Sequence, residues 1–266
     1  MIRDITIGQY YPADSILHRL DPRVKFIGTF LFLVSLFVAD SFWGYLLATC
    51  FLAGIIALSK VPVKFMLKGL KPLFILLLIT VLFNLFLIPG TVIWQAGFLK
   101  ITREGITQAV KIGIRLIYLV MGSSVMTLTT TPNQLTDGLE RILKPLNRIH
   151  VPVHDISMMM SIALRFIPIL MEETDKIMKA QMARGADFEN GNLLQRAKNL
   201  IPLLVPLFIS AFRRADDLAM AMEARCYHGG ENRTQMKPLI YQRRDYAAYA
   251  ATLVYLAADI AIRIAL

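Results

Sequence analysis

The chain has 266 residues, of which 56% are hydrophobic and only 18% are charged, and its formal net charge is +10. Soluble domains carry about 25% charged residues, so this composition excludes a disordered chain and does not fit an ordinary soluble enzyme. No basic low-complexity tail accounts for the positive charge, so we expect a lipid bilayer and not nucleic acid as the surroundings.

Long apolar runs follow one another along the first half of the chain and return at its end. Because a membrane span needs about 20 mostly apolar residues, the long run after Arg23 is divided at Asp40-Ser41. The expected spans are 23–39, 42–58, a third that starts at Pro72 and ends near Ile88-Pro89-Gly90, 106–130 and 246–266. The sequence therefore predicts an all-α, polytopic membrane protein with about five transmembrane helices.

Four lysines without an intervening acid follow the second span, at Lys60, Lys64, Lys68 and Lys71. Cytoplasmic loops carry such an excess of positive charge, so we place this loop inside a cell membrane that the chain crosses several times. The N-terminus and residues 131–243 are then cytoplasmic as well. Lys111 and Arg115 fall at the outer end of the fourth span, where they either snorkel or pack among helices, or form an intramembrane contact site.

Three regions follow from this layout: an N-terminal membrane region over 1–130 with four spans, a cytoplasmic helical region over 131–243, and a C-terminal transmembrane helix over 244–266. The middle stretch has 16 basic and 13 acidic residues between 131 and 245, with strong helical periodicity. It predicts a long helix over 155–184 that ends at Gly185, and a later helix that ends near Ala224. Pro202 and Pro206 are expected to kink or interrupt that later helix.

The ends of these two long amphipathic helices resemble each other at one constant offset, which is the separation of Arg184 and Arg225 in the sequence. The six residues concerned are Ala183, Arg184, Gly185, Ala224, Arg225 and Cys226. Small side chains allow a partner to approach closely, and the planar arginine side chain can reach past them to bind it. The two ends therefore resemble equivalent docking elements for two similar partner surfaces. In the alternative interpretation, the alanines are helix-crossing contacts and the arginines cap helix C-termini.

Several short motifs occur in a fixed order along nearly the whole chain. They are LHRLDPRVK at 17–25, TTPNQL at 130–135, ALRFIP at 163–168, ARG at 183–185, PLLVPL at 202–207 and AMEARCY at 221–227. Together with the span layout, they resemble the transmembrane T component (EcfT/CbiQ-like family) of energy-coupling factor (ECF) transporters, which are ABC-type importers of vitamins or metal ions.

The resemblance implies a scaffold that is not an enzyme. In this family, a membrane part contacts a substrate-binding S component, and long cytoplasmic coupling helices contact two ATP-binding ATPase subunits, the A components. The short Ala-Arg-Gly motifs dock on the ATPases, and here they correspond to Ala183-Arg184-Gly185 and Ala224-Arg225-Cys226. The second motif departs from the pattern because cysteine, which is penalised in left-handed geometry, replaces glycine.

Catalytic chemistry has little support in the sequence. It has no phosphate-binding Gly-x-x-x-x-Gly-Lys-Ser/Thr loop, so this chain is not expected to bind ATP. We also expect no cofactor and no metal ion on it. His150 and His154 are four positions apart, but Pro152 between them argues against a shared helical face. Two alternatives remain: a conventional ABC permease that forms the substrate path as a homodimer, and a membrane-embedded lipid-modifying enzyme with acids such as Asp21, Asp155 or Asp259.

Overall fold

The computed structural model describes residues 10–96, 99–186, 188, 195, 198–229, 236 and 238–265. The chain divides into two compact units, and the division falls within one helix, α6 (Pro132–Leu143). The larger unit consists of residues 8–138 and 239–266, and the arm unit consists of residues 1–7 and 139–238. Each unit is described below by itself.

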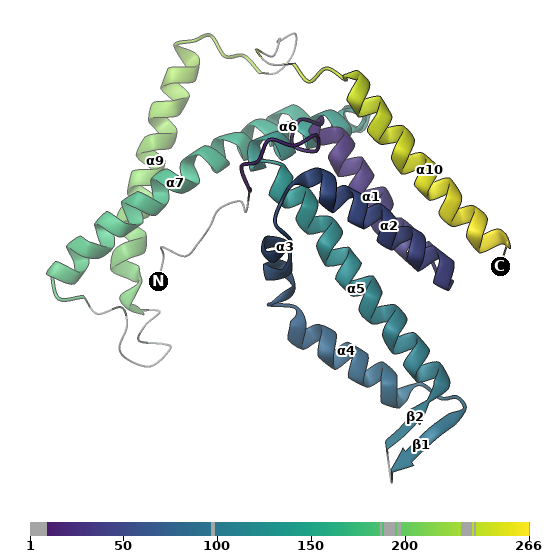
Figure 1. The fold of residues 1–266 in the computed structure, drawn as a ribbon. Coiled ribbons are helices and arrows are strands. Elements are labelled where there is room, and N and C mark those ends of the chain that lie inside the picture. Colours follow the sequence, from purple (N-terminus) through teal and green to yellow (C-terminus); the bar gives the residue numbers. More distant parts are fainter. Residues whose placement is uncertain are drawn as a thin grey trace. The chain divides into compact units, whose positions relative to one another are not determined.

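Helices dominate the larger unit (Figure 1). In chain order its elements are α1 (Pro22–Val38), α2 (Phe42–Ser59), α3 (Val63–Leu70), α4 (Phe74–Leu87), β1 (Val92–Ala96), β2 (Leu99–Thr102), α5 (Arg103–Thr129) and α10 (Arg243–Ala265). The arm unit holds the end of α6, a 3-10 helix (Lys144–Ile149), α7 (Val153–Ala183) and α9 (Ile201–Glu223). Between the end of α7 and the start of α9, the structure describes residues 184–186, 188, 195 and 198–200.

Local sequence signals explain where the first two helices begin. Asp21 accepts a hydrogen bond from the backbone N–H of Arg23, and Pro22 occupies the first helical position, where its missing N–H costs nothing. Ser41 accepts a hydrogen bond of 3.2 Å from the N–H of Gly44 and so caps α2. The predicted break at Asp40-Ser41 is therefore confirmed.

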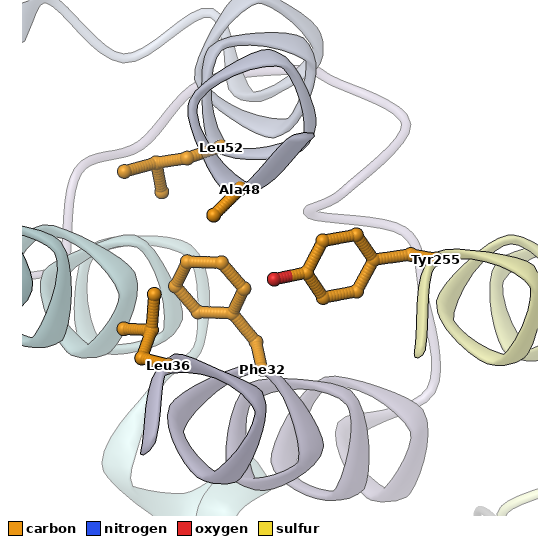
Figure 2. Close-up of a cluster of buried hydrophobic side chains, with 5 residues drawn as sticks. All are labelled: Phe32, Leu36, Ala48, Leu52 and Tyr255. Atoms are coloured by element: carbon orange, nitrogen blue, oxygen red, sulfur yellow. The ribbon is translucent and has the colours of Figure 1, made fainter. Parts of the chain in front are cut away.

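The core of the larger unit lies where α1, α2 and α10 meet beside α5. Figure 2 shows Phe32 and Leu36 of α1, Ala48 and Leu52 of α2, and Tyr255 of α10 gathered around one space. The Tyr255 hydroxyl shares a hydrogen bond of 2.8 Å with Ser35 Oγ, so its polar end is satisfied inside an apolar cluster. On α5, Gly122 allows the close approach of α1, because a Cβ at that position would lie 2.8 Å from the Phe32 ring.

Four of the described helices are long and apolar enough to cross a membrane, namely α2, α5, α7 and α10. A fifth span results if α3 and α4, which are bent by 64° at their junction, are counted together. The predicted all-α, polytopic class is confirmed, although the set of helices differs from the expectation. With 17 residues α1 is about 26 Å long, slightly short of a bilayer core, whereas α7 reaches the required length despite its assignment to a cytoplasmic region.

Two features of the larger unit were not expected. The four-lysine segment is partly helical, since α3 covers Val63–Leu70, with Pro72 following its end. Residues 92–102, which lie between the third and fourth expected spans, contain the antiparallel strands β1 and β2, with Val92 opposite Thr102. The β-branched residues Val92, Ile93, Ile101 and Thr102 were the available signal for strands.

Lys111 and Arg115 contact the turn between α1 and α2. Lys111 Nζ lies 3.1 Å from Asp40 Oδ1, and Arg115 donates a hydrogen bond of 3.3 Å to the Ala39 carbonyl. The hydrogen bond and charge of Lys111 hold the pKa of Asp40 below its usual value. Of the two interpretations of these cations, contact among the chain's own helices is the one that the structure supports.

Candidate functional site

The end of α7 has the geometry that its sequence predicts. Gly185 has a φ of +88°, in the left-handed region where glycine avoids the steric cost of a Cβ. The N–H of Ala186 donates to the Gln181 carbonyl at 3.0 Å, and the N–H of Gly185 donates to the Met182 carbonyl at 3.0 Å. These two bonds form a Schellman motif, which satisfies carbonyls that the helix end would otherwise leave unpaired.

The end of α9 repeats this arrangement bond for bond. The N–H of Tyr227 donates to the Met222 carbonyl at 3.0 Å, and the N–H of Cys226 donates to the Glu223 carbonyl at 2.8 Å. Every donor and acceptor follows its counterpart in α7 at the offset that separates Arg184 from Arg225. The repeat seen in the sequence is thus a repeat of backbone geometry, and both arginines stand immediately before the left-handed residue.

All six predicted site residues lie on the surface of the arm unit, and the chain leaves them exposed. Both triplets, 183–185 and 224–226, place an arginine between two small residues. No hydrogen bond, ion pair or ring contact to the side chain of Arg184 or Arg225 occurs within the described part of the chain. Each guanidinium therefore keeps all five of its N–H donors free for another molecule.

Cys226 adopts the same left-handed conformation as Gly185, with a φ of +54°. A Cβ in this region costs about 1 kcal/mol relative to glycine. The α9 end therefore keeps the same cap as the α7 end, but at lower local stability.

Replacing Cys226 with glycine is expected to stabilise the α9 end by roughly 0.5–1 kcal/mol, because it removes the Cβ penalty and keeps both cap bonds. The reciprocal change, Gly185→Cys, is expected to destabilise the α7 end by a similar amount. Hydrogen exchange of the last turn of each helix measures both effects. Faster exchange at the α9 end of the Cys226→Gly variant would contradict the assigned geometry.

The helices α7 and α9 pack against each other within the arm unit, where Figure 1 shows them crossing. Gln181 Nε2 donates to the Pro202 carbonyl at 3.2 Å, so the last turn of α7 lies beside the first turn of α9. Because α9 has 23 residues, Arg184 and Arg225 stand about 35 Å apart along its axis. Pro202 occupies the first turn of α9, where proline is tolerated, and Pro206 lies inside the helix.

An ion pair joins the two helices at equivalent positions of the repeat. Arg214 Nη2 lies 3.0 Å from Glu173 Oε2, and the two positions are 41 apart, the same offset as the two tips. Arg184 lies about three helical turns beyond Glu173 on α7, and Arg225 lies about three helical turns beyond Arg214 on α9. The two tips therefore lie at equal distances along their helices from this ion pair, a relationship that sequence reasoning missed.

The histidine and carboxylate candidates are separated. Pro152 directly precedes α7, so His150 lies outside that helix and does not share a face with His154. His154 Nδ1 lies 2.9 Å from Glu140 Oε1, and Ser157 Oγ donates to Glu140 Oε2 at 2.9 Å. Because the carboxylate stands between serine and histidine, this cluster lacks the serine–histidine contact of an activated nucleophile. Asp21 caps α1, and Asp259 is buried in α10.

Comparison of the sequence with known proteins identifies its family. The family model described as "Cobalt transport protein" (CbiQ) matches residues 13–236. The chain is 57% identical over 256 residues to the energy-coupling factor transporter transmembrane protein EcfT of Ruminiclostridium cellulolyticum, covering 96% of each protein. It is 48% identical over 255 residues to the protein of the same name from Bacillus subtilis, again covering 96% of each.

The family model covers both helix ends and every candidate span except α10, which lies beyond its last matched residue. EcfT of Clostridium kluyveri is 55% identical over 266 residues, and this match covers 99% of the chain. The resemblance inferred from the ordered motifs is confirmed. The chain belongs to the EcfT/CbiQ family and is an energy-coupling transmembrane subunit of an energy-coupling factor transporter, a transport component and not an enzyme.

Proposed function

We propose that this subunit carries ATP-driven motion from two ATPase subunits to a substrate-binding S component in the membrane. One observation carries the proposal, namely the two equivalent helix ends. At each end an exposed arginine directly precedes the left-handed residue of the same type of backbone cap. Ala183-Arg184-Gly185 would dock on one ATPase and Ala224-Arg225-Cys226 on the other. Two similar tips about 35 Å apart suit two similar proteins better than one.

The coupling would pass through the crossing of α7 and α9. Nucleotide binding draws the two ATPases together, and each tip moves with the ATPase that holds it. Since helices are stiff and the Glu173–Arg214 pair joins them, a change at the tips alters the crossing as a whole. Each tip lies about 16 Å along its helix from this ion pair, so the two helices would transmit the displacement over equal lengths.

The S component would lie against an apolar surface that the chain itself leaves uncovered. On α9, exposed side chains recur at helical spacing in Leu204, Phe208 and Phe212, which are 44%, 61% and 68% exposed. Such a face needs lipid or protein as a cover. Because the S component selects the substrate in this scheme, the subunit itself would serve vitamin or metal-ion import without binding the cargo.

The N-terminus and residues 131–243 would be cytoplasmic, in a multi-pass protein of the cell membrane. The support is the charge distribution: the four lysines at 60–71 and the pair Arg243-Arg244 at the start of α10 fall on the same predicted side. This orientation gives the arm unit access to the ATPases, which need cytoplasmic nucleotide. It also leaves α7, although long and apolar enough to span, as a coupling helix outside the bilayer.

Native mass spectrometry of the complex that co-purifies with the tagged chain tests this function. The expected complex has one copy of this chain, two ATPases and one membrane-embedded substrate-binding subunit, with ATP hydrolysis only when the ATPases are present. A homodimer of this chain with one ATPase per copy would instead indicate a conventional permease. Turnover of a lipid substrate by the chain alone would indicate the membrane enzyme.

A further inference from the structure

The larger unit contains an open-sided cavity of about 550 Å³ that the coupling function does not use. Its walls come from α1, α2, α5, α10 and the segment that precedes α1. This volume lies within the range of sites that bury small organic ligands. A cavity of this size inside a membrane bundle has to be filled by some part of its surroundings.

Small residues create the space. Gly28, Gly54 and Gly122 line the cavity from three different helices, and Ala248 and Ala251 line it from α10. A Cβ at Gly54 would find no atom within 4 Å, so this wall is open and not tightly packed. Most other lining side chains are aliphatic or aromatic, and the site therefore suits a hydrocarbon chain.

Two cations line this apolar cavity, and no carboxylate does so among the described lining residues. Lys25 is buried, and its Nζ donates to the carbonyls of Thr129 at 2.8 Å and His18 at 3.3 Å. Arg244 is half-buried, and its Nε is fully shielded from solvent without a hydrogen-bond partner within the described chain. A shielded guanidinium donor without an acceptor is costly, so an anionic ligand in the cavity would lower this cost.

The acids nearest to these cations are already engaged elsewhere. Asp245 accepts hydrogen bonds from the backbone N–H groups of Asp21, at 2.9 Å, and Gln242, at 2.7 Å. Asp21 in turn is paired with the Arg23 guanidinium at 2.7 Å. Neither acid is among the residues that line the cavity, so the described chain offers no anion to Arg244 there.

Charge and hydrocarbon occupy different parts of the site. Lys25 lies in the first turn of α1 and Arg244 in the first turn of α10, whereas the lining on α10 continues to Thr252, about 12 Å further along. An anionic head at the helix starts with an apolar chain running between the helices would match this arrangement. A free anion would leave the apolar length empty, and a zwitterionic lipid would bring its own cation to a site that already holds two.

We propose that this cavity binds an anionic phospholipid, with its phosphate at Arg244 and Lys25 and an acyl chain between α1, α2 and α10. Basic pockets between transmembrane helices are suited to acidic lipid headgroups, and the arginine fork can hold two phosphate oxygens at once. The lipid then fills a gap in the helix bundle and supplies an anion that the described residues do not offer to Arg244 in the cavity. This role is independent of ATPase docking.

Lipid binding by the purified full-length chain tests the proposal. Phosphatidylglycerol and phosphatidylcholine with identical acyl chains are titrated, and bound lipid is counted by native mass spectrometry. The wild type is expected to bind phosphatidylglycerol about tenfold more tightly, since one charge-assisted pair corresponds to roughly this factor. Arg244→Gln should bring the ratio close to one, whereas the matched neighbour Arg243→Gln, which does not line the cavity, should leave it unchanged.

Variants that fill the cavity provide a second test of the proposal. Gly54→Phe and Ala251→Phe, from different walls, should each lower phosphatidylglycerol binding at least tenfold, and either variant suffices if the other does not fold. Glycerol 3-phosphate, which has the head without the chain, should not compete. Equal binding of the two lipids, an equal loss in Arg243→Gln, unchanged binding in the filled variants or competition by glycerol 3-phosphate would each overturn the proposal.

Discussion

Replacing both Arg184 and Arg225 with alanine is expected to abolish assembly with the ATPases and substrate uptake, while the chain remains folded in the membrane. Both side chains are exposed and make no hydrogen bond, ion pair or ring contact within the described chain, so their loss removes no such interaction from the fold. Truncating one partner of a desolvated charge pair at an interface costs about 2–5 kcal/mol. Each single variant should therefore weaken ATPase binding by roughly 30-fold or more.

The matched control is Arg213→Ala, which removes an exposed arginine from α9 away from the tip. It should leave assembly unchanged, as measured by co-purification and by surface-immobilised binding of the ATPases. Arg184→Lys keeps the charge but loses the planar fork, and it should retain only part of the affinity. Full uptake by the double alanine variant, or an equal defect in Arg213→Ala, would show that the tips do not dock.

Asp245→Ala is expected to have the largest effect on stability among single changes in the larger unit. Asp245 is 1% exposed, and its carboxylate accepts from the N–H of Asp21, 224 residues away, and from the N–H of Gln242. Alanine would leave both donors unpaired, one of them in a buried bond, at a cost of about 2–4 kcal/mol. The thermal unfolding temperature in detergent should fall by several degrees.

Asp14→Ala is the matched control for this change. Asp14 also pairs with a neighbour, Arg19, but the two side chains are 74% and 62% exposed, and such surface pairs contribute little. Asp245→Asn, which keeps one acceptor oxygen, should fall between the alanine variant and the wild type. An equal loss of thermal stability in Asp14→Ala and Asp245→Ala would indicate that the hydrogen bond from the Asp21 N–H to Asp245 stabilises the fold no more than a surface ion pair does.

Much of the membrane architecture could be predicted because its signals are local. The apolar runs, the caps at Asp21 and Ser41, and the stop at Gly185 each depend on a few neighbouring residues, and the structure begins or ends helices at all of them. The hairpin at 92–102 was missed because its strands are short and the first of them lies inside a long uncharged run. Hydropathy does not separate a short strand from the end of a span.

Some features of the candidate site could likewise be predicted from the sequence, and others could not. The constant offset between the helix ends and the two arginines were visible in the sequence, since a repeat of residue types can be read directly. That Cys226 would keep the left-handed cap could not be read there, because cysteine at this place is compatible with several helix ends. The cap follows from the bonds to Met222 and Glu223.

By itself, the sequence determined the membrane class, the helical character of the chain, the twin arginine ends and the family. Only the tertiary structure decided which distant residues meet: Lys111 with Asp40, Asp245 with the start of α1, and Arg214 with Glu173. The physical reason is the distance along the chain over which each kind of interaction acts. Helix formation, capping and hydropathy act over a few residues, whereas ion pairs and cavities between helices depend on how whole faces pack, which no short window of sequence contains.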